Sequence, residues 1–184
     1  MTTTQSALMG LVLWMTGCVP SLQPLYTDKD TLFDPALVGT WEGKEESWLI
    51  RRSEGNFYQL TVKPAKGAPA TFEGRLVELG TARFLDLYPG EPDIQNDLYK
   101  MHLVPAHSIS RIRLERDTLR VAMLDDSWLR DLIRDQKVQI AHQILKDNML
   151  VLTAATAELQ ALVSRYADDP KAFADPSEFR RISQ

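Results

Sequence analysis

Three histidines are the residues of this chain best suited to bind a metal ion or transfer protons: His102, His107 and His142. A zinc site usually uses paired ligands at a short spacing, such as two histidines one turn apart on a helix, and no such pair occurs here. His102 and His107 are an odd number of residues apart, so on one continuous strand they would point to opposite faces. Pro105 lies between them and could change this orientation. We therefore expect partly exposed strand histidines, no metal site and no cofactor.

The patterns that activate a nucleophile or bind a phosphate group are missing from the sequence. There is no G-x-S-x-G turn. Ser108 directly follows His107, and adjacent residues on a strand point apart and cannot act as a nucleophile and its base. The segment from Gly39 to Lys44 has the wrong spacing for a phosphate loop. We expect no catalytic residues.

Two pairs of carboxylates, Asp125-Asp126 and Asp168-Asp169, lie at the ends of expected helices. Asp126 is best explained as a helix N-cap. Four arginines on one expected hairpin could contact anionic lipid headgroups or another protein: Arg111, Arg113, Arg116 and Arg120. Because Glu115 and Asp117 dilute their charge, we expect a solvated strand face with cross-strand ion pairs.

The only cysteine, Cys18, ends an apolar stretch that begins at Ala7. The run Met15-Thr16-Gly17-Cys18 resembles the lipobox of a bacterial lipoprotein signal peptide, which the signal peptidase cuts before the cysteine. The resemblance implies that residues 1–17 are removed as a signal peptide. It also implies diacylglycerol on the Cys18 thiol and an acyl group such as palmitate on its new α-amine. Because Val19 and not an aspartate follows, it further implies a lipid anchor in the outer membrane, with the protein facing the periplasm.

The length of this apolar stretch favours a removed leader over a membrane-spanning helix. It is about 13 residues long, whereas the core of a bilayer requires about 20. Pro20 and Pro24 then interrupt any helix, and we expect residues 18–33 to form a flexible leash between the lipid and the domain. The residues before Ala7 include no Lys or Arg. The alternative interpretation is an N-terminal core strand with a buried free cysteine.

The composition indicates one domain of ordinary size. The chain has 184 residues, of which 44% are hydrophobic, and we assign residues 34–184 to a single β-rich domain. Its net charge of −4 argues against nucleic acid as a partner, because binding requires a basic face. With one cysteine, no intrachain disulfide can form. The expected partners are the membrane, through the N-terminal lipid, and either an apolar ligand or an envelope protein.

Short stretches of alternating apolar and polar residues dominate the middle of the chain and predict β-strands. Turn signals such as Glu54-Gly55-Asn56 separate them. The expected strands are 38–42, 47–52, 57–63, 72–79, 82–88, 101–104 continuing after Pro105 as 108–116, 118–124, 140–145 and 149–153. The sequence therefore predicts a mainly β fold of about nine short strands, in an antiparallel curled sheet or closed barrel.

Helices are predicted at a few places by caps and by apolar spacing. Asp34 caps a single turn that begins at Pro35, and another turn is expected within 94–99. Longer helices are expected over 127–135 and from a cap at Thr156 to Asp169, the second with apolar residues Leu159, Leu162, Val163 and Tyr166 on one face. Asp175-Pro176-Ser177-Glu178 resembles a capping box and predicts a last helix to Arg181. We expect the C-terminal helices to pack on the sheet.

Gly39-Thr40-Trp41, at the first strand of the domain, resembles the G-x-W motif of lipocalins. The resemblance implies an eight-stranded barrel that holds an apolar ligand and is closed at one end by Trp41. It covers little more than these three residues, and the helix at 127–135 is not part of the family's usual pattern. The alternative for Trp41 is a core tryptophan at the start of a strand.

Two functions follow from these patterns. The first is a lipid-anchored envelope lipoprotein whose non-enzymatic domain has a structural or interaction role. The second is lipocalin-like binding or transport of a small apolar ligand such as a fatty acid or lipid. The volume inside the sheet distinguishes them, since small barrels are either filled by side chains or hollow.

Overall fold

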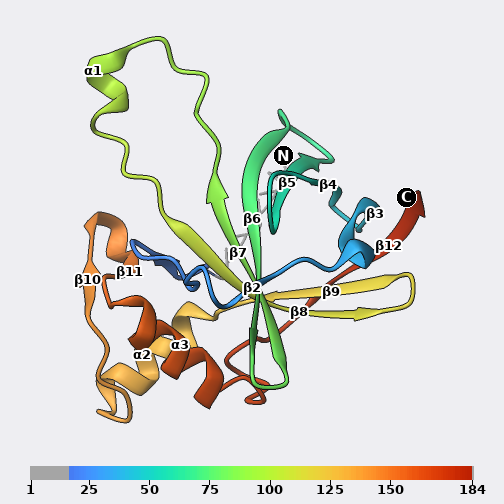
Figure 1. Ribbon diagram of the computed structural model, residues 1–184. Helices are drawn as coiled ribbons and strands as arrows, with labels where there is room; N and C mark the ends of the chain where they lie inside the picture. The colour runs from blue at the N-terminus through green and yellow to red at the C-terminus, as the bar shows by residue number, and fades with distance from the viewer. Residues whose placement is uncertain (1–16, 184) are drawn as a thin grey trace, which may run out of the picture.

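Eight strands form a closed antiparallel barrel in the computed structural model, which describes residues 17–183 (Figure 1). The barrel strands are β3 (Gly39–Glu42), β4 (Glu46–Arg52), β5 (Phe57–Pro64), β6 (Ala70–Leu79), β7 (Ala82–Pro89), β8 (His107–Glu115), β9 (Thr118–Met123) and β12 (Ser177–Ser183). From β3 to β9 each strand pairs with the next along the chain. β12 then pairs with both β9 and β3 and closes the barrel. The predicted antiparallel sheet is therefore a closed barrel.

Four short strands lie outside the barrel: β1 (Pro20–Ser21), β2 (Thr31–Leu32), β10 (His142–Ile144) and β11 (Leu150–Leu152). β1 pairs with β8 on one side and with β11 on the other, and β2 pairs with β6. The described residues thus contain twelve strands and not about nine. The predicted strands 140–145 and 149–153 are present as the β10–β11 hairpin.

The helices are α1 (Asp97–Lys100), α2 (Asp126–Arg134) and α3 (Thr156–Arg165), with 3₁₀ turns at Pro35–Leu37 (η1) and Lys146–Asn148 (η2). Asp34 caps η1 as predicted, because its carboxylate accepts the Ala36 N–H at 2.9 Å. Asp125 and not Asp126 caps α2, since its side chain accepts the Trp128 N–H at 2.7 Å. Thr156 does not cap α3 but is its first residue.

Two hydrophobic cores follow from the alternation of side chains along the strands. One fills the barrel interior and includes Trp41, Trp48, Tyr58, Leu60, Leu76, Leu85, Leu119 and Phe179. The other lies on the outer face of β7 and β8, where Phe84 and Ile109 pack in one cluster with Leu129 of α2 and Leu159 of α3. α2 and α3 therefore cover part of the outer surface of the barrel.

The predicted last helix is wrong, because 177–183 forms strand β12. Phe179 is buried in the barrel core, and the backbone of this segment bonds to β3 and β9. A capping box is a local signal. Here it is outweighed by the two rows of backbone hydrogen bonds that close the barrel.

The predicted strand at 101–104 is also wrong. These residues belong to the long connection between β7 and β8, beyond the last paired residue of either strand. Met101 and Val104 are exposed to solvent. An apolar run without a neighbouring strand has no hydrogen-bond partner that would hold it in a sheet.

The segment after Cys18 is not a free leash. Val19, Ser21 and Leu25 are buried, and β1 bonds to β8 and β11. The Gln160 side chain of α3 also donates to the Leu25 carbonyl at 2.9 Å. The prolines prevent helix in this segment, but its apolar side chains pack against the barrel and the helices.

Candidate functional site

Trp41 and Arg181 hold the η1 turn over the start of β3. The Trp41 indole is fully buried and its N–H donates to the Leu37 carbonyl at 2.9 Å. The Arg181 guanidinium lies 4.1 Å from the centre of the indole ring and donates to the carbonyls of Val38, at 2.7 Å, and of Ala36. Gly39 has φ 139°, a conformation that side chains rarely adopt. The motif Gly39-Thr40-Trp41 thus lies at one end of the barrel, where the η1 turn leads into β3 and β12 pairs with it.

The sequence does not point to Arg181, because the capping box at 175–178 predicts a helix over its segment. Had the segment been predicted as a strand, the two-residue spacing would place Phe179 and Arg181 on the same face.

The middle of the barrel is filled by side chains. Tyr58, Leu60 and Leu76 are almost completely buried there. A Cβ atom added to Gly74 would lie 2.5 Å from Cδ1 of Leu60, so even a methyl group does not fit without movement. The hydroxyl of Ser110 is buried and has no hydrogen-bond partner among the described residues.

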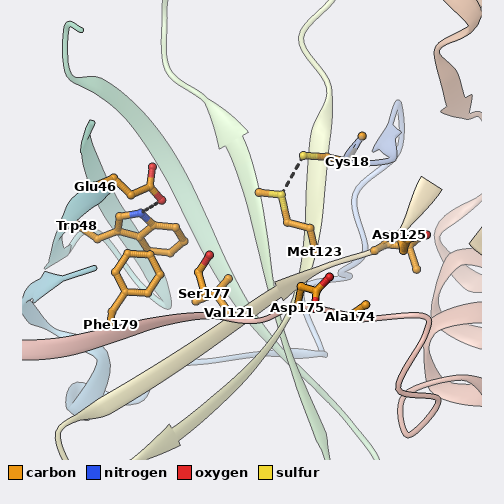
Figure 2. Close-up of a pocket in the computed structure, with 12 residues that line it drawn as sticks. Cys18, Glu46, Trp48, Val121, Met123, Asp125, Ala174, Asp175, Ser177 and Phe179 are labelled. Atoms are coloured by element: carbon orange, nitrogen blue, oxygen red, sulfur yellow. Dashed lines mark hydrogen bonds between the residues drawn. The ribbon is translucent and has the colours of Figure 1, made fainter. Parts of the chain in front are cut away.

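A cavity of about 260 Å³ lies at the other end of the barrel, and Figure 2 shows the residues that line it. Trp48 and Phe179 form its floor, with ring centres 4.8 Å apart. Cys18 and Asp125, which form an isolated backbone bridge, lie at its rim. We call this end of the barrel the mouth.

The Cys18 thiol is directed toward Met123, and the two sulfur atoms lie 2.9 Å apart (Figure 2). Partial burial raises the pKa of the thiol above its ordinary value, and a backbone hydrogen bond opposes this in part. The thiol is therefore protonated at neutral pH. The residue itself is exposed, so the alternative of a buried cysteine is wrong. Met15 and Thr16 lie outside the described residues, and Gly17 lines the cavity.

A buried acid–histidine pair joins the N-terminal segment to the barrel. Asp86 and His107 are only 1% and 7% exposed, and Nδ1 of His107 lies 2.7 Å from Oδ1 of Asp86. Oδ2 of Asp86 accepts the Leu25 N–H at 2.7 Å. An ionised carboxylate can only accept, so in that form of the pair Nδ1 of His107 is the donor. Tyr26 and Tyr88 pack on the imidazole.

The prediction that His107 is partly exposed is wrong. Tyr26 and Tyr88 pack on its ring and Asp86 contacts Nδ1, so the side chain is buried. The sequence does not point to Asp86, since a lone carboxylate in a strand pattern gives no sign of a partner from another strand.

The three histidines do not form a cluster. His102 lies on the connection between β7 and β8, and Nδ1 of His142 lies 2.9 Å from the Ile140 carbonyl. Within residues 17–183, no group of three His, Cys, Asp or Glu side chains is placed to hold a metal ion.

The arginine hairpin carries the predicted ion pairs. Arg120 contacts Glu115 at 3.1 Å and Glu178 of β12 at 3.3 Å. Arg111 contacts Asp168 at 2.8 Å. Asp169 accepts the indole N–H of Trp128 at 3.1 Å, so the second carboxylate pair ties the end of α3 to α2 and the barrel.

None of the helices within residues 17–183 combines the length and the apolar character needed to cross a membrane. Comparison with known proteins identifies no relative: no protein-family model, no curated protein and no solved structure matches this chain.

Proposed function

We propose that this protein is a lipid-anchored lipoprotein of a bacterial envelope, attached to the outer membrane through Cys18 and facing the periplasm. Its barrel domain acts there in a structural or interaction role and not in catalysis. The observation that carries the proposal is the apolar leader that ends in Met15-Thr16-Gly17-Cys18. One acyl chain binds a membrane only marginally, and each further buried methylene adds about 0.8 kcal/mol, so the multiple chains of a lipoprotein anchor give stable attachment.

The position of Cys18 in the fold supports this proposal. Cys18 is exposed at the mouth, and the packed domain begins with the next residue, Val19. A lipid on the Cys18 sulfur can therefore leave the domain without displacing a core side chain. Acylation of the sulfur would disturb only the contact between Cys18 and Met123, and Met123 is itself partly exposed.

The test is to replace the lipidated residue and to examine the protein isolated from cells. Cys18→Ala should leave an uncleaved precursor, whereas Gln23→Ala, at an exposed position nearby, should be processed normally. Mass spectrometry of the wild-type protein should give a chain that begins at Cys18 and carries the acyl groups. A wild-type chain that retains residues 1–17 with a free thiol would overturn the proposal.

A second candidate function is transport of a small apolar ligand, and the closed eight-stranded barrel with Trp41 near one end is the observation that favours it. The interior weighs against it. The mouth cavity of about 260 Å³ is smaller than the roughly 300–1,000 Å³ typical of small-molecule sites. Below it, a methyl group on Gly74 would fit only if the Leu60 side chain moved.

Native mass spectrometry of the isolated protein and titration with a fluorescent fatty acid test the carrier function. Co-purified lipid, or saturable binding that Trp48→Ala weakens, would favour it over a filled barrel. Absence of both would leave the structural or interaction role.

A further inference from the structure

The connection between β7 and β8, residues 90–106, is the longest link between consecutive strands from β3 to β9. By comparison, β6 and β7 are joined by Gly80 and Thr81, and β8 and β9 by Arg116 and Asp117. Figure 1 shows that residues 90–106, with α1 near their tip, project away from the barrel and from the outer helices. We call residues 90–106 the α1 loop.

The α1 loop presents large apolar side chains to solvent, from α1 and from the limb that returns to β8. The exposed fractions are 68% for Leu98, 58% for Tyr99, 71% for Met101, 41% for Leu103 and 73% for Val104. Single exposed apolar residues are normal on a protein surface, but a contiguous group of this kind marks an interaction site. The aliphatic chains suit an apolar environment, and Tyr99 suits its boundary with water.

This conformation is held by contacts within the loop. The Asn96 side chain accepts the Tyr99 N–H at 2.9 Å and so caps α1. Lys100 pairs with Glu91 on the opposite limb at 3.1 Å. A cavity of about 620 Å³, lined by Tyr88, Leu103, Val104 and three prolines among others, lies between the limbs. The Lys100 ammonium is thus paired with the opposite limb, and the apolar side chains of α1 and of the returning limb remain exposed.

The returning limb of the α1 loop joins the barrel beside the segment that follows Cys18. His107, where the limb enters β8, pairs with Ser21, and Ser108 pairs with Pro20. Because Val19 and Ser21 are buried, no slack chain separates the barrel from Cys18. An acylated Cys18 therefore holds the mouth at the lipid surface, on the side from which the α1 loop projects.

We propose that the α1 loop is a second membrane contact, which inserts Leu98, Met101 and Val104 into the bilayer that holds the Cys18 lipid. The inference rests on the proposed lipid anchor. The α1 loop carries three carboxylates, Glu91, Asp93 and Asp97, against the single Lys100. Uncharged and zwitterionic lipids therefore suit it better than anionic ones. Together the two contacts fix the orientation of the barrel on the membrane.

The test places a spin label at Met101→Cys, and separately at Val104→Cys, in the full protein isolated from cells and reconstituted in vesicles of phosphatidylcholine and phosphatidylethanolamine. The matched control is Ile182→Cys on β12, which is similarly exposed at 59%. We expect both loop labels about 5–10 Å below the headgroup level, as for other interfacial segments, and the control label in water. Because all three side chains are exposed, these substitutions should not disturb the fold.

Mass spectrometry of the same samples separates failure of this inference from failure of the anchor. An acylated protein whose loop labels are as accessible to water as the Ile182 label refutes the membrane contact and leaves the anchor intact. Labels that are shielded in whole envelopes but not in vesicles of pure lipid also refute it, because the partner is then a protein. A chain that carries no acyl group refutes the anchor, and with it the two-point attachment.

Discussion

Replacing Asp86 by alanine should destabilise the fold more than any surface substitution, because its carboxylate serves two buried groups. One oxygen faces Nδ1 of His107 and the other accepts the Leu25 N–H, both at 2.7 Å. Asp86→Ala leaves the imidazole N–H and the backbone N–H without a partner, in a place where Asp86 and His107 are almost inaccessible to water.

The size of the effect follows from these two losses. Each buried N–H group that loses its hydrogen-bond partner costs about 1–3 kcal/mol. We expect the free energy of unfolding to fall by about 3–5 kcal/mol in total, since the losses share one carboxylate and do not add fully. For a domain of this size the melting temperature should fall by about 2–4 °C per kcal/mol.

The assay is urea unfolding followed by tryptophan fluorescence, with the midpoint and the slope compared between variants. Asp28→Ala, at an exposed position in the same N-terminal region, should change the free energy of unfolding by less than about 0.5 kcal/mol. Hydrogen exchange at the Leu25 amide should become faster in Asp86→Ala, because that amide loses its acceptor.

A double substitution distinguishes the loss of the Asp86–His107 contact from the loss of packing caused by the smaller alanine side chain. Asp86→Leu with His107→Leu removes both side-chain polar groups and fills the space with apolar atoms, so it should recover the part of the loss that comes from the orphaned imidazole. The remaining loss belongs to the Leu25 N–H, which still has no acceptor in this variant. A loss below about 1 kcal/mol for Asp86→Ala, at unchanged slope, would refute the reasoning, because neither buried group would then depend on the carboxylate.

Three further predictions address the barrel. Gly74→Ala should reduce the free energy of unfolding by about 1–3 kcal/mol, because its methyl group meets the end of the Leu60 side chain, and Leu60→Val in the same chain should restore part of it; no loss would mean that Leu60 has space to move aside. Arg181→Ala should cost about 1.5–3 kcal/mol, because it loses charged hydrogen bonds to two carbonyls and the contact with Trp41. Arg181→Lys should recover only part of this, since an ammonium lacks the planar fork, and full recovery would contradict the assigned geometry. Burial raises the pKa of Tyr58 to about 12 from 10.0, so the neutral form is favoured in the folded state. Stability should be unaffected by this group below about pH 10 and should fall as the pH rises toward 12, because the unfolded chain loses the phenolic proton first. Titration of phenolate absorbance should show one late tyrosine that is missing in Tyr58→Phe; simultaneous ionisation of all tyrosines in the folded protein would contradict this.

The strands from β4 to β7, the β8–β9 hairpin and the η1 turn could be predicted from the sequence because their signals are local. Alternation sets which side chains of β5 face inward, and Gly55 at φ 59° permits the turn before it. Asp34 and Pro35 define a helix start within four residues. The apolar character of the stretch that ends at Cys18 is also contained in the sequence alone.

The tertiary structure alone decided the features that depend on contacts between distant residues. Segment 177–183 is a strand because β3 and β9 leave one gap in the barrel, and a local capping signal cannot register that gap. Asp86 and His107 come together through the pairing of β7 with β8, and Leu25 reaches them only because the segment after Cys18 packs on β8. Residues 101–104 stay out of the sheet because no strand edge lies beside them. Local propensity describes what a segment can form, whereas partners far along the chain determine which of those forms buries its apolar atoms and satisfies its backbone.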